Sequence, residues 1–195
     1  MKAHAQLCFL PSPEECGLDF LSRELLQAIA PQVGTYSAEQ RVIPGIHFTC
    51  NGALIGWVIG ASANTIGNAG NNLSLELQIW RCGLLQSFSE VQTRIGNRCE
   101  LTNSTVVTNS TLHGTRNPNV YVVPQNPPIQ FQSDDTLGIF QPAGSPVELF
   151  YHQGVGPYNT RETNQTSALN NLQIRNDAQD FPLVRAMVES GKLIS

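Results

Sequence analysis

The 195-residue sequence predicts an all-β fold, either an antiparallel β-sandwich or a jelly roll, with one N-terminal helix. Two observations lead to this fold class. From residue 39 onward, short segments of alternating apolar and polar residues are separated by turn-forming Gly, Pro, Asn and Asp. These segments do not alternate with helical patterns, as they would in a parallel α/β fold. We therefore expect a helical or linker segment over residues 1–38 and a β-sandwich domain over residues 39–190.

The expected helix lies between Ser12 and Pro31. Ser12 is a suitable N-cap, and Glu15, three residues later, completes a capping box. The apolar face then repeats at helical spacing, in Leu18, Leu21, Leu25 and Ile29. Pro31 ends the pattern. We expect this helix to pack on the sheet or to connect to a preceding module.

Four strands are expected in the first half of the domain, over residues 41–50, 53–60, 75–80 and 90–96. The first alternates between apolar and polar residues. The dipeptide Asn51-Gly52 predicts a tight turn before the second strand, whose nearly all-apolar sequence suits a strand covered on both faces. In the third strand Trp80 shares a face with the polar Glu76 and Gln78, which predicts a half-buried strand.

The second half of the domain is expected to hold shorter strands and longer loops. Residues 97–117 are rich in Thr and Asn and are interpreted as a loop. A short strand over residues 119–123 is expected to end at the prolines that follow it. Further strands are expected over residues 137–140, 147–152 and 183–188, with a loop over residues 154–177.

Charge and hydropathy exclude two kinds of partner. Only 13% of the residues are charged, the net charge is −4, and the 11 basic residues are scattered. Binding to nucleic acid requires clustered Lys and Arg, so a nucleic-acid partner is not expected. No segment of about 18 apolar residues occurs, so we expect no membrane insertion within this chain. We expect the partner to be an extracellular protein or glycan.

The five cysteines favour a disulfide-bonded chain. They lack the CxxC spacing of zinc sites and of thioredoxin-like redox motifs. Cys82 and Cys99 flank an expected hairpin and are interpreted as one pair. Cys16 and Cys50 are interpreted as a second pair that ties the helix to the first strand, which leaves Cys8 unpaired. The alternative interpretation is a set of buried free thiols.

Four acceptor sequences for N-linked glycans support an extracellular location. They begin at residues that we expect in surface loops: Asn72, Asn103, Asn109 and Asn164. The first ten residues do not resemble a signal peptide, because Pro11 ends a short apolar stretch. A secreted chain of this kind is therefore expected to be part of a larger protein. Retention in the cell with free thiols is the alternative.

Four motifs in fixed order give the chain a resemblance to a known kind of module. They are QRVIPGIHFTCNG (residues 40–52) followed by Trp57, LQIWR (77–81), FQSDDTLGIFQP (131–142), and LFYHQ (149–153) followed by Gly156-Pro157. Together they resemble an uncharacterised extracellular β-sandwich module of multidomain cell-surface proteins from sponges and other early animals. The resemblance covers roughly residues 40–185. It implies a receptor ectodomain or adhesion context and transfers no catalytic residue. The module more often has Gly-Asp where this chain has Ser133-Asp134-Asp135.

The sequence offers little chemistry for catalysis. The four histidines are far apart, and the chain contains neither an HExxH motif nor a GxSxG nucleophile elbow. We therefore expect neither an enzyme nor a cofactor. Three residues are candidate ligand contacts. Trp80 would be a stacking platform for sugar if exposed, and Asp134 or Asp135 would be a calcium ligand. Core packing for Trp80 and a turn-forming role for the aspartates are the simpler interpretations.

These observations favour an extracellular, non-catalytic binding or adhesion module of a cell-surface or matrix protein. A glycan-binding, lectin-like jelly roll, with or without calcium, is the alternative and predicts an exposed aromatic side chain in a groove. A secreted hydrolase subunit is the third class and predicts a deep pocket with clustered histidines and carboxylates.

Overall fold

The computed structural model describes residues 38–48, 51–63, 74–83, 98–114 and 120–190. Several expected features lie outside these residues: the helix between Ser12 and Pro31, the strand over residues 90–96, the sequon at Asn72, and Cys8, Cys16 and Cys50. In the part of the chain that is described, the secondary structure is all-β, as expected. None of it forms a helix long and apolar enough to span a membrane.

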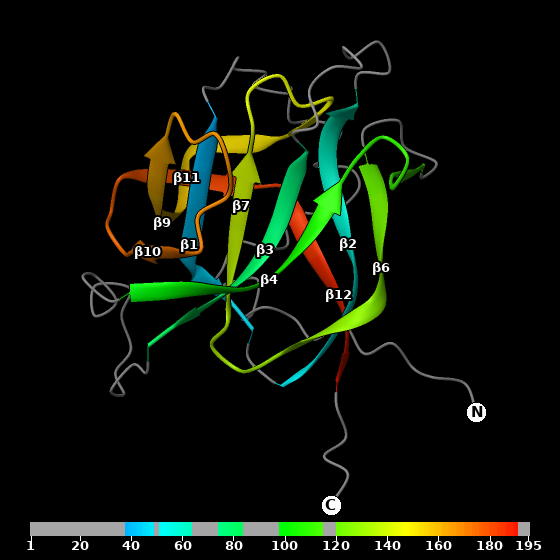
Figure 1. The fold of residues 1–195 in the computed structure, drawn as a ribbon, viewed down its shortest axis with the longest axis horizontal. Coiled ribbons are helices and arrows are strands. Elements are labelled where there is room, and N and C mark those ends of the chain that lie inside the picture. Colours follow the sequence, from blue (N-terminus) through cyan, green and yellow to red (C-terminus); the bar gives the residue numbers. More distant parts are fainter. Residues whose placement is uncertain (1–37, 49–50, 64–73, 84–97, 115–119, 191–195) are drawn as a thin grey trace, which may run out of the picture.

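The described residues form twelve strands in two antiparallel sheets (Figure 1). The strands are β1 (Glu39–His47), β2 (Gly52–Ala63), β3 (Leu75–Cys82), β4 (Arg98–Val107), β5 (His113–Gly114), β6 (Val120–Phe131), β7 (Thr136–Gln141), β8 (Val147–Leu149), β9 (Tyr151–Thr163), β10 (Asn171–Gln173), β11 (Ala178–Pro182) and β12 (Val184–Ser190). The seven-stranded sheet has the order β10-β4-β3-β7-β1-β9-β11. The five-stranded sheet has the order β12-β2-β6-β5, and β8 pairs with the end of β2.

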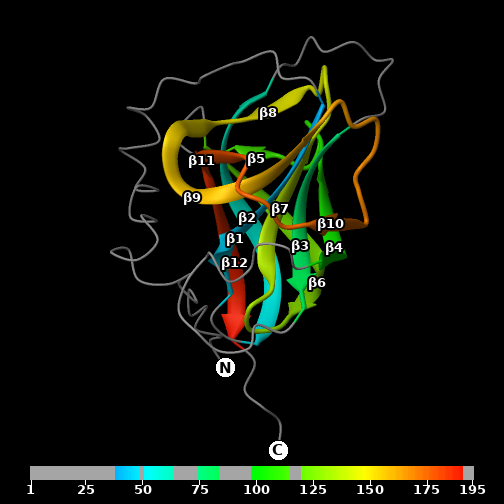
Figure 2. The ribbon, with the colours of Figure 1, turned by 90° about the vertical axis from the view of Figure 1, so that its left-hand side faces the viewer.

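Both sheets contribute to one large apolar core. Trp57 and Ile59 come from the five-stranded sheet, and Leu77, Ile79 and Ile139 come from the seven-stranded sheet. Alternation along the strands directs every second side chain into this core. The strand β9 curves strongly at one side of the molecule (Figure 2), and it pairs with β11 along one part and with β1 along another.

A second, smaller core covers the outer face of the seven-stranded sheet. It contains Val42, Trp80, Cys99, Leu172 and Ile174. The prediction of a half-buried third strand was therefore wrong, because the chain around β10 folds back over β3 and β4. Buried apolar side chains on both faces of β3 are the consequence.

Two loop predictions and one strand end in the second half of the domain were also wrong. Residues 98–107 form β4, whose Thr and Val side chains are β-branched and suit a pleated strand. The strand β9 continues to Thr163, and β10 follows it, within the stretch interpreted as a loop. The short strand at residues 119–123 continues as β6 to Phe131.

Two of the three prolines of β6 lie where the ladder with β2 is interrupted. The register between β2 and β6 shifts between the pair Gly56–Pro124 and the pair Leu54–Ile129, so Pro127 and Pro128 lie in the unregistered stretch. Prolines are tolerated at such bulges and at strand edges, where no amide hydrogen is needed for pairing.

Candidate functional site

The two aspartates predicted as candidate calcium ligands lie in the turn between β6 and β7, and they have different environments. Asp134 is exposed and has a φ of 70°. Asp135 is buried, and both its oxygens accept hydrogen bonds of 2.8 Å from the Arg81 guanidinium. One of these oxygens also accepts the backbone N–H of Gln132 at 2.8 Å. The Asp135 side chain therefore holds the backbone of the turn and connects the turn to β3.

Both carboxylate oxygens of Asp135 already accept hydrogen bonds, so they are poorly placed to bind a metal cation. Its carboxylate already has a bidentate cationic partner, and a calcium ion would have to displace Arg81. Among the described residues, no three His, Cys, Asp or Glu side chains are grouped as a metal site would require. The interpretation of Asp135 as a turn-forming residue is the one that its contacts support.

Trp80 is not an exposed platform for sugar. Its side chain is 0% exposed, and its indole N–H donates to Gln78 Oε1 at 2.8 Å. A Cβ atom placed on Gly138 of β7 would lie 2.3 Å from the indole, so the ring lies directly against this glycine. Gln78 in turn accepts a 2.7 Å hydrogen bond from Gln40 of β1. Trp80 is therefore part of a buried row that crosses β3, β7 and β1.

A buried cluster of charges, which sequence reasoning missed, joins β1, β9 and β11. Arg41 is 2% exposed, and its guanidinium donates to Glu39 at 2.7 Å and to Asp180 at 2.8 Å. Arg161 of β9 also binds Glu39, and the Arg41 guanidinium lies 4.3 Å from the centre of the Tyr151 ring. The only local signal was Glu39 two residues before Arg41, on the same face of one strand.

The cluster keeps Arg41 charged inside the protein. Burial alone would lower the pKa of Arg41, but Tyr151, Glu39 and Asp180 outweigh burial and raise the pKa above its ordinary value. Breaking a buried ion pair by removing one partner is strongly destabilising. Removal of any one of these groups would therefore leave an uncompensated buried charge where the three strands meet.

A second, exposed set of charges lies on the outside of β9. Arg175 donates to Glu162 at 2.6 Å and to Asp177 at 3.1 Å. Burial raises the pKa of Asp177, but the backbone N–H of Arg161 and the side chain of Arg175 outweigh burial and hold it below its ordinary value. Exposed ion pairs of this kind contribute little to the free energy of unfolding. Their main effect is to make this part of the surface polar.

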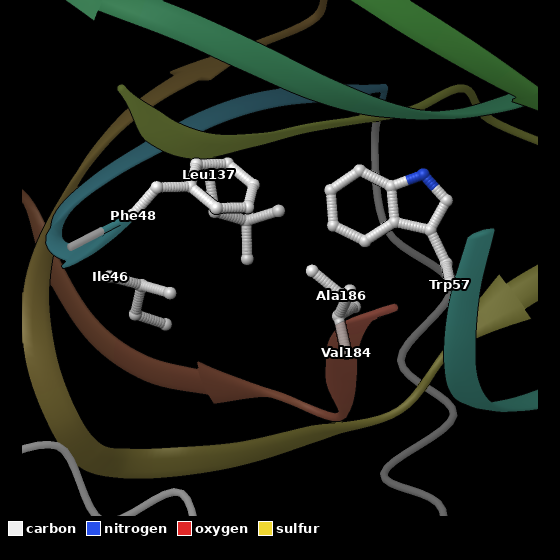
Figure 3. Close-up of a pocket in the computed structure, with 6 residues that line it drawn as sticks. All are labelled: Ile46, Phe48, Trp57, Leu137, Val184 and Ala186. Carbon is white, nitrogen blue, oxygen red and sulfur yellow. The ribbon is translucent and has the colours of Figure 1, made fainter. Parts of the chain in front are cut away.

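An apolar cavity of about 10 Å³ lies between the sheets (Figure 3). It is lined by Ile46, Phe48, Trp57, Leu137, Val184 and Ala186. The indole nitrogen of Trp57 points away from this cavity (Figure 3) and donates to Thr105 Oγ1 at 3.0 Å. The volume is about that of one water molecule, and an apolar lining offers no partners to hold one. The cavity is a packing defect of the core.

The predicted pair Cys82–Cys99 is confirmed as a disulfide. The two residues are opposite each other in the register of β3 and β4, with Cα atoms 3.9 Å apart. Cys99 belongs to the smaller core, so the bridge fixes the covered end of this strand pair.

Three of the four predicted glycosylation sites lie in the described residues, and all three asparagines are exposed. Asn109 lies in the turn after β4, and Asn164 directly follows β9 with a φ of 59°. Asn103 lies within β4, so its predicted placement in a loop was wrong.

Comparisons of this chain with protein-family models, with curated proteins and with solved structures found no match.

Proposed function

We propose that this chain is an extracellular, non-catalytic binding or adhesion module of a cell-surface or matrix protein. The observation that carries the proposal is the disulfide between Cys82 and Cys99. Structural disulfides form and persist in oxidising compartments and are rare in the cytosol. The exposed sequon asparagines Asn103, Asn109 and Asn164 support the same compartment.

A binding role is supported by how the charged groups are used. The three buried carboxylates described above, Glu39, Asp135 and Asp180, are each held by an arginine. Charge in the interior therefore stabilises the fold, and the polar surface is left for recognition by shape and hydrogen bonding. The resemblance of residues 40–185 to an extracellular surface module favours the same conclusion.

We further propose that the two sheets form a sandwich of the jelly-roll kind and that the helix expected between Ser12 and Pro31 precedes it. Support comes from the core that the two sheets share and from the capping box and apolar spacing of the helix.

The glycan-binding alternative needs an aromatic residue other than Trp80. Tyr158 of β9 is 45% exposed, so its ring presents an apolar face and a polar hydroxyl to solvent. If glycan binding is the function, Tyr158→Ala abolishes binding on a glycan array, whereas Tyr121→Ala, a change at a less exposed tyrosine, retains it. Equal binding by the two variants would remove Tyr158 from this role.

The proposal is tested by secreting the chain behind a foreign signal peptide and measuring its intact mass before deglycosylation, after deglycosylation and after reduction. We expect secretion, loss of glycan mass, and a gain of hydrogens on reduction. The secreted protein is then tested for binding to cell surfaces. Retention in the cell, no glycan and five free thiols would overturn the proposal.

A further inference from the structure

Among the described strands, one edge of the seven-stranded sheet has no pairing partner along most of β4. On one side β4 pairs with β3 from Cys99 to Val107, with a register shift at Thr102. On the other side β10 pairs only with residues 98–100, and the N–H of Leu101 donates to Asn170. From Thr102 to Val107 no described strand pairs with this edge. Exposed strand edges are templates for pairing with another chain.

The other strand edges among the described residues carry recognised protection against such pairing. The strand β5 has only two residues, and β8 and β10 have three each. The outer strand β12 carries the charged Arg185 and Glu189, and β11 ends in Pro182 and buries the charge of Asp180. The uncovered part of β6 contains Pro124, Pro127 and Pro128. Short strands, charges and prolines are the usual means of blunting an edge.

The open stretch of β4 has neither a charge nor a proline. Its sequence, TNSTVV over residues 102–107, is rich in β-branched residues, and Val106 is 50% exposed. Segments of high β-propensity and low charge associate readily when exposed. What this stretch does carry is the sequon that begins at Asn103.

The geometry of Asn103 suits a glycan on this edge. Its side chain is exposed, and its Oδ1 accepts the N–H of Ser104 at 3.1 Å. Its Nδ2, the atom that is glycosylated, donates to no described residue. The hydroxyl of Thr105 is buried between Trp57 Nε1 and Gln125 Oε1, so the glycan has to be attached before β4 packs against the core.

We propose that Asn103 carries an N-linked glycan that caps the open edge of β4 and prevents pairing with a second copy of this chain. In the transfer, Nδ2 loses a proton and bonds to C1 of the oligosaccharide, whose bond to a lipid diphosphate carrier breaks. The inference rests on the proposed extracellular location. It adds a role for the one glycan whose asparagine lies within the open stretch of β4.

Three variants at this edge separate the glycan from the edge itself. All are secreted with Asn109→Gln, because a glycan at the neighbouring Asn109 would cover the same edge. Asn103→Gln removes the glycan and leaves the edge open. Asn103→Lys removes the glycan but adds a charge to the edge. Ser104→Pro destroys the sequon and removes an N–H that donates to the Asn103 side chain. Asn164→Gln is the control for loss of a distant glycan.

Sedimentation velocity and glycopeptide mass spectrometry give the readout. We expect the background, Asn103→Lys, Ser104→Pro and Asn164→Gln to remain monomeric. The Asn103→Gln variant is expected to double its polypeptide mass as its concentration rises. A monomeric Asn103→Gln variant, or association of the Lys and Pro variants to the same degree, would overturn the proposal.

The site occupancies separate this inference from the proposed function. If the protein is secreted with glycans at other sequons but not at Asn103, the edge proposal fails and the extracellular proposal stands. If every sequon is empty and the thiols are free, both proposals fail.

Discussion

At Asp134 the backbone adopts a left-handed conformation, with a φ of 70°, that glycine accepts without strain. We expect Asp134→Gly to raise the free energy of unfolding by about 0.5 kcal/mol, because Asp is among the better-tolerated residues in this region. Urea unfolding measures the change. The neighbouring Ser133, whose φ is not positive, is the control, and Ser133→Gly should lower stability. A loss of stability in Asp134→Gly would show that the side chain of Asp134 is more important than its backbone strain.

Arg81 and Arg175 allow a matched test of how burial of the acidic partner changes the contribution of an ion pair to the free energy of unfolding. Both arginine side chains are 46% exposed, but the partner of Arg81 is 2% exposed, whereas those of Arg175 are 30% and 31% exposed. We expect Arg81→Met to lower the free energy of unfolding by about 2 kcal/mol, because it leaves the buried Asp135 without its cation. Arg175→Met should cost less than about 0.5 kcal/mol. Equal losses in urea unfolding would contradict this account.

For the pair β3–β4, the disulfide is expected to be a major source of stability. The bridge closes a loop with a sequence separation of 17 residues, and constraining an unfolded chain by a loop of this size contributes about 3 kcal/mol. We expect the double variant Cys82→Ala/Cys99→Ala to lose about that amount in urea unfolding.

The reductant dithiothreitol provides the control for this prediction. It should destabilise the native protein and have a much smaller effect on the double variant. An unchanged urea midpoint in the double variant would show that the strand ladder alone holds β3 and β4 together.

The whole molecule should unfold as one unit, because both sheets bury side chains in the larger core. The two tryptophans report on different parts: Trp57 belongs to the five-stranded sheet, and Trp80 belongs to the smaller core of the seven-stranded sheet. In Trp57→Phe and in Trp80→Phe, the fluorescence of the remaining indole should follow the same urea transition as far-UV circular dichroism of that variant. A Trp80 signal that changes before the circular dichroism would show that the smaller core opens independently.

The sequence by itself determined the local elements whose pattern is strong. The apolar run of β2, the alternation of β3 and the strands β7 and β12 follow from residues that are adjacent in the chain. The pair Cys82–Cys99 was also predictable, because the two cysteines flank segments that could pair as neighbours. A turn at Asp134 and Asp135 followed from the preference of aspartate for turns.

Only the tertiary structure decided which faces are covered and which side chains meet. The burial of Trp80 depends on the chain around Leu172 and on the space left by Gly138, which are distant in sequence. Arg41 meets Asp180 and Arg161 because β1, β9 and β11 are neighbours in one sheet. The sequence of β4 resembles a polar loop, and pairing with β3 makes it a strand. Among the described strands, its edge beyond Glu100 has no partner because β10 is short. The physical reason is that strand pairing and register are set by contacts between distant segments, whereas periodicity reports only on the residues within one segment.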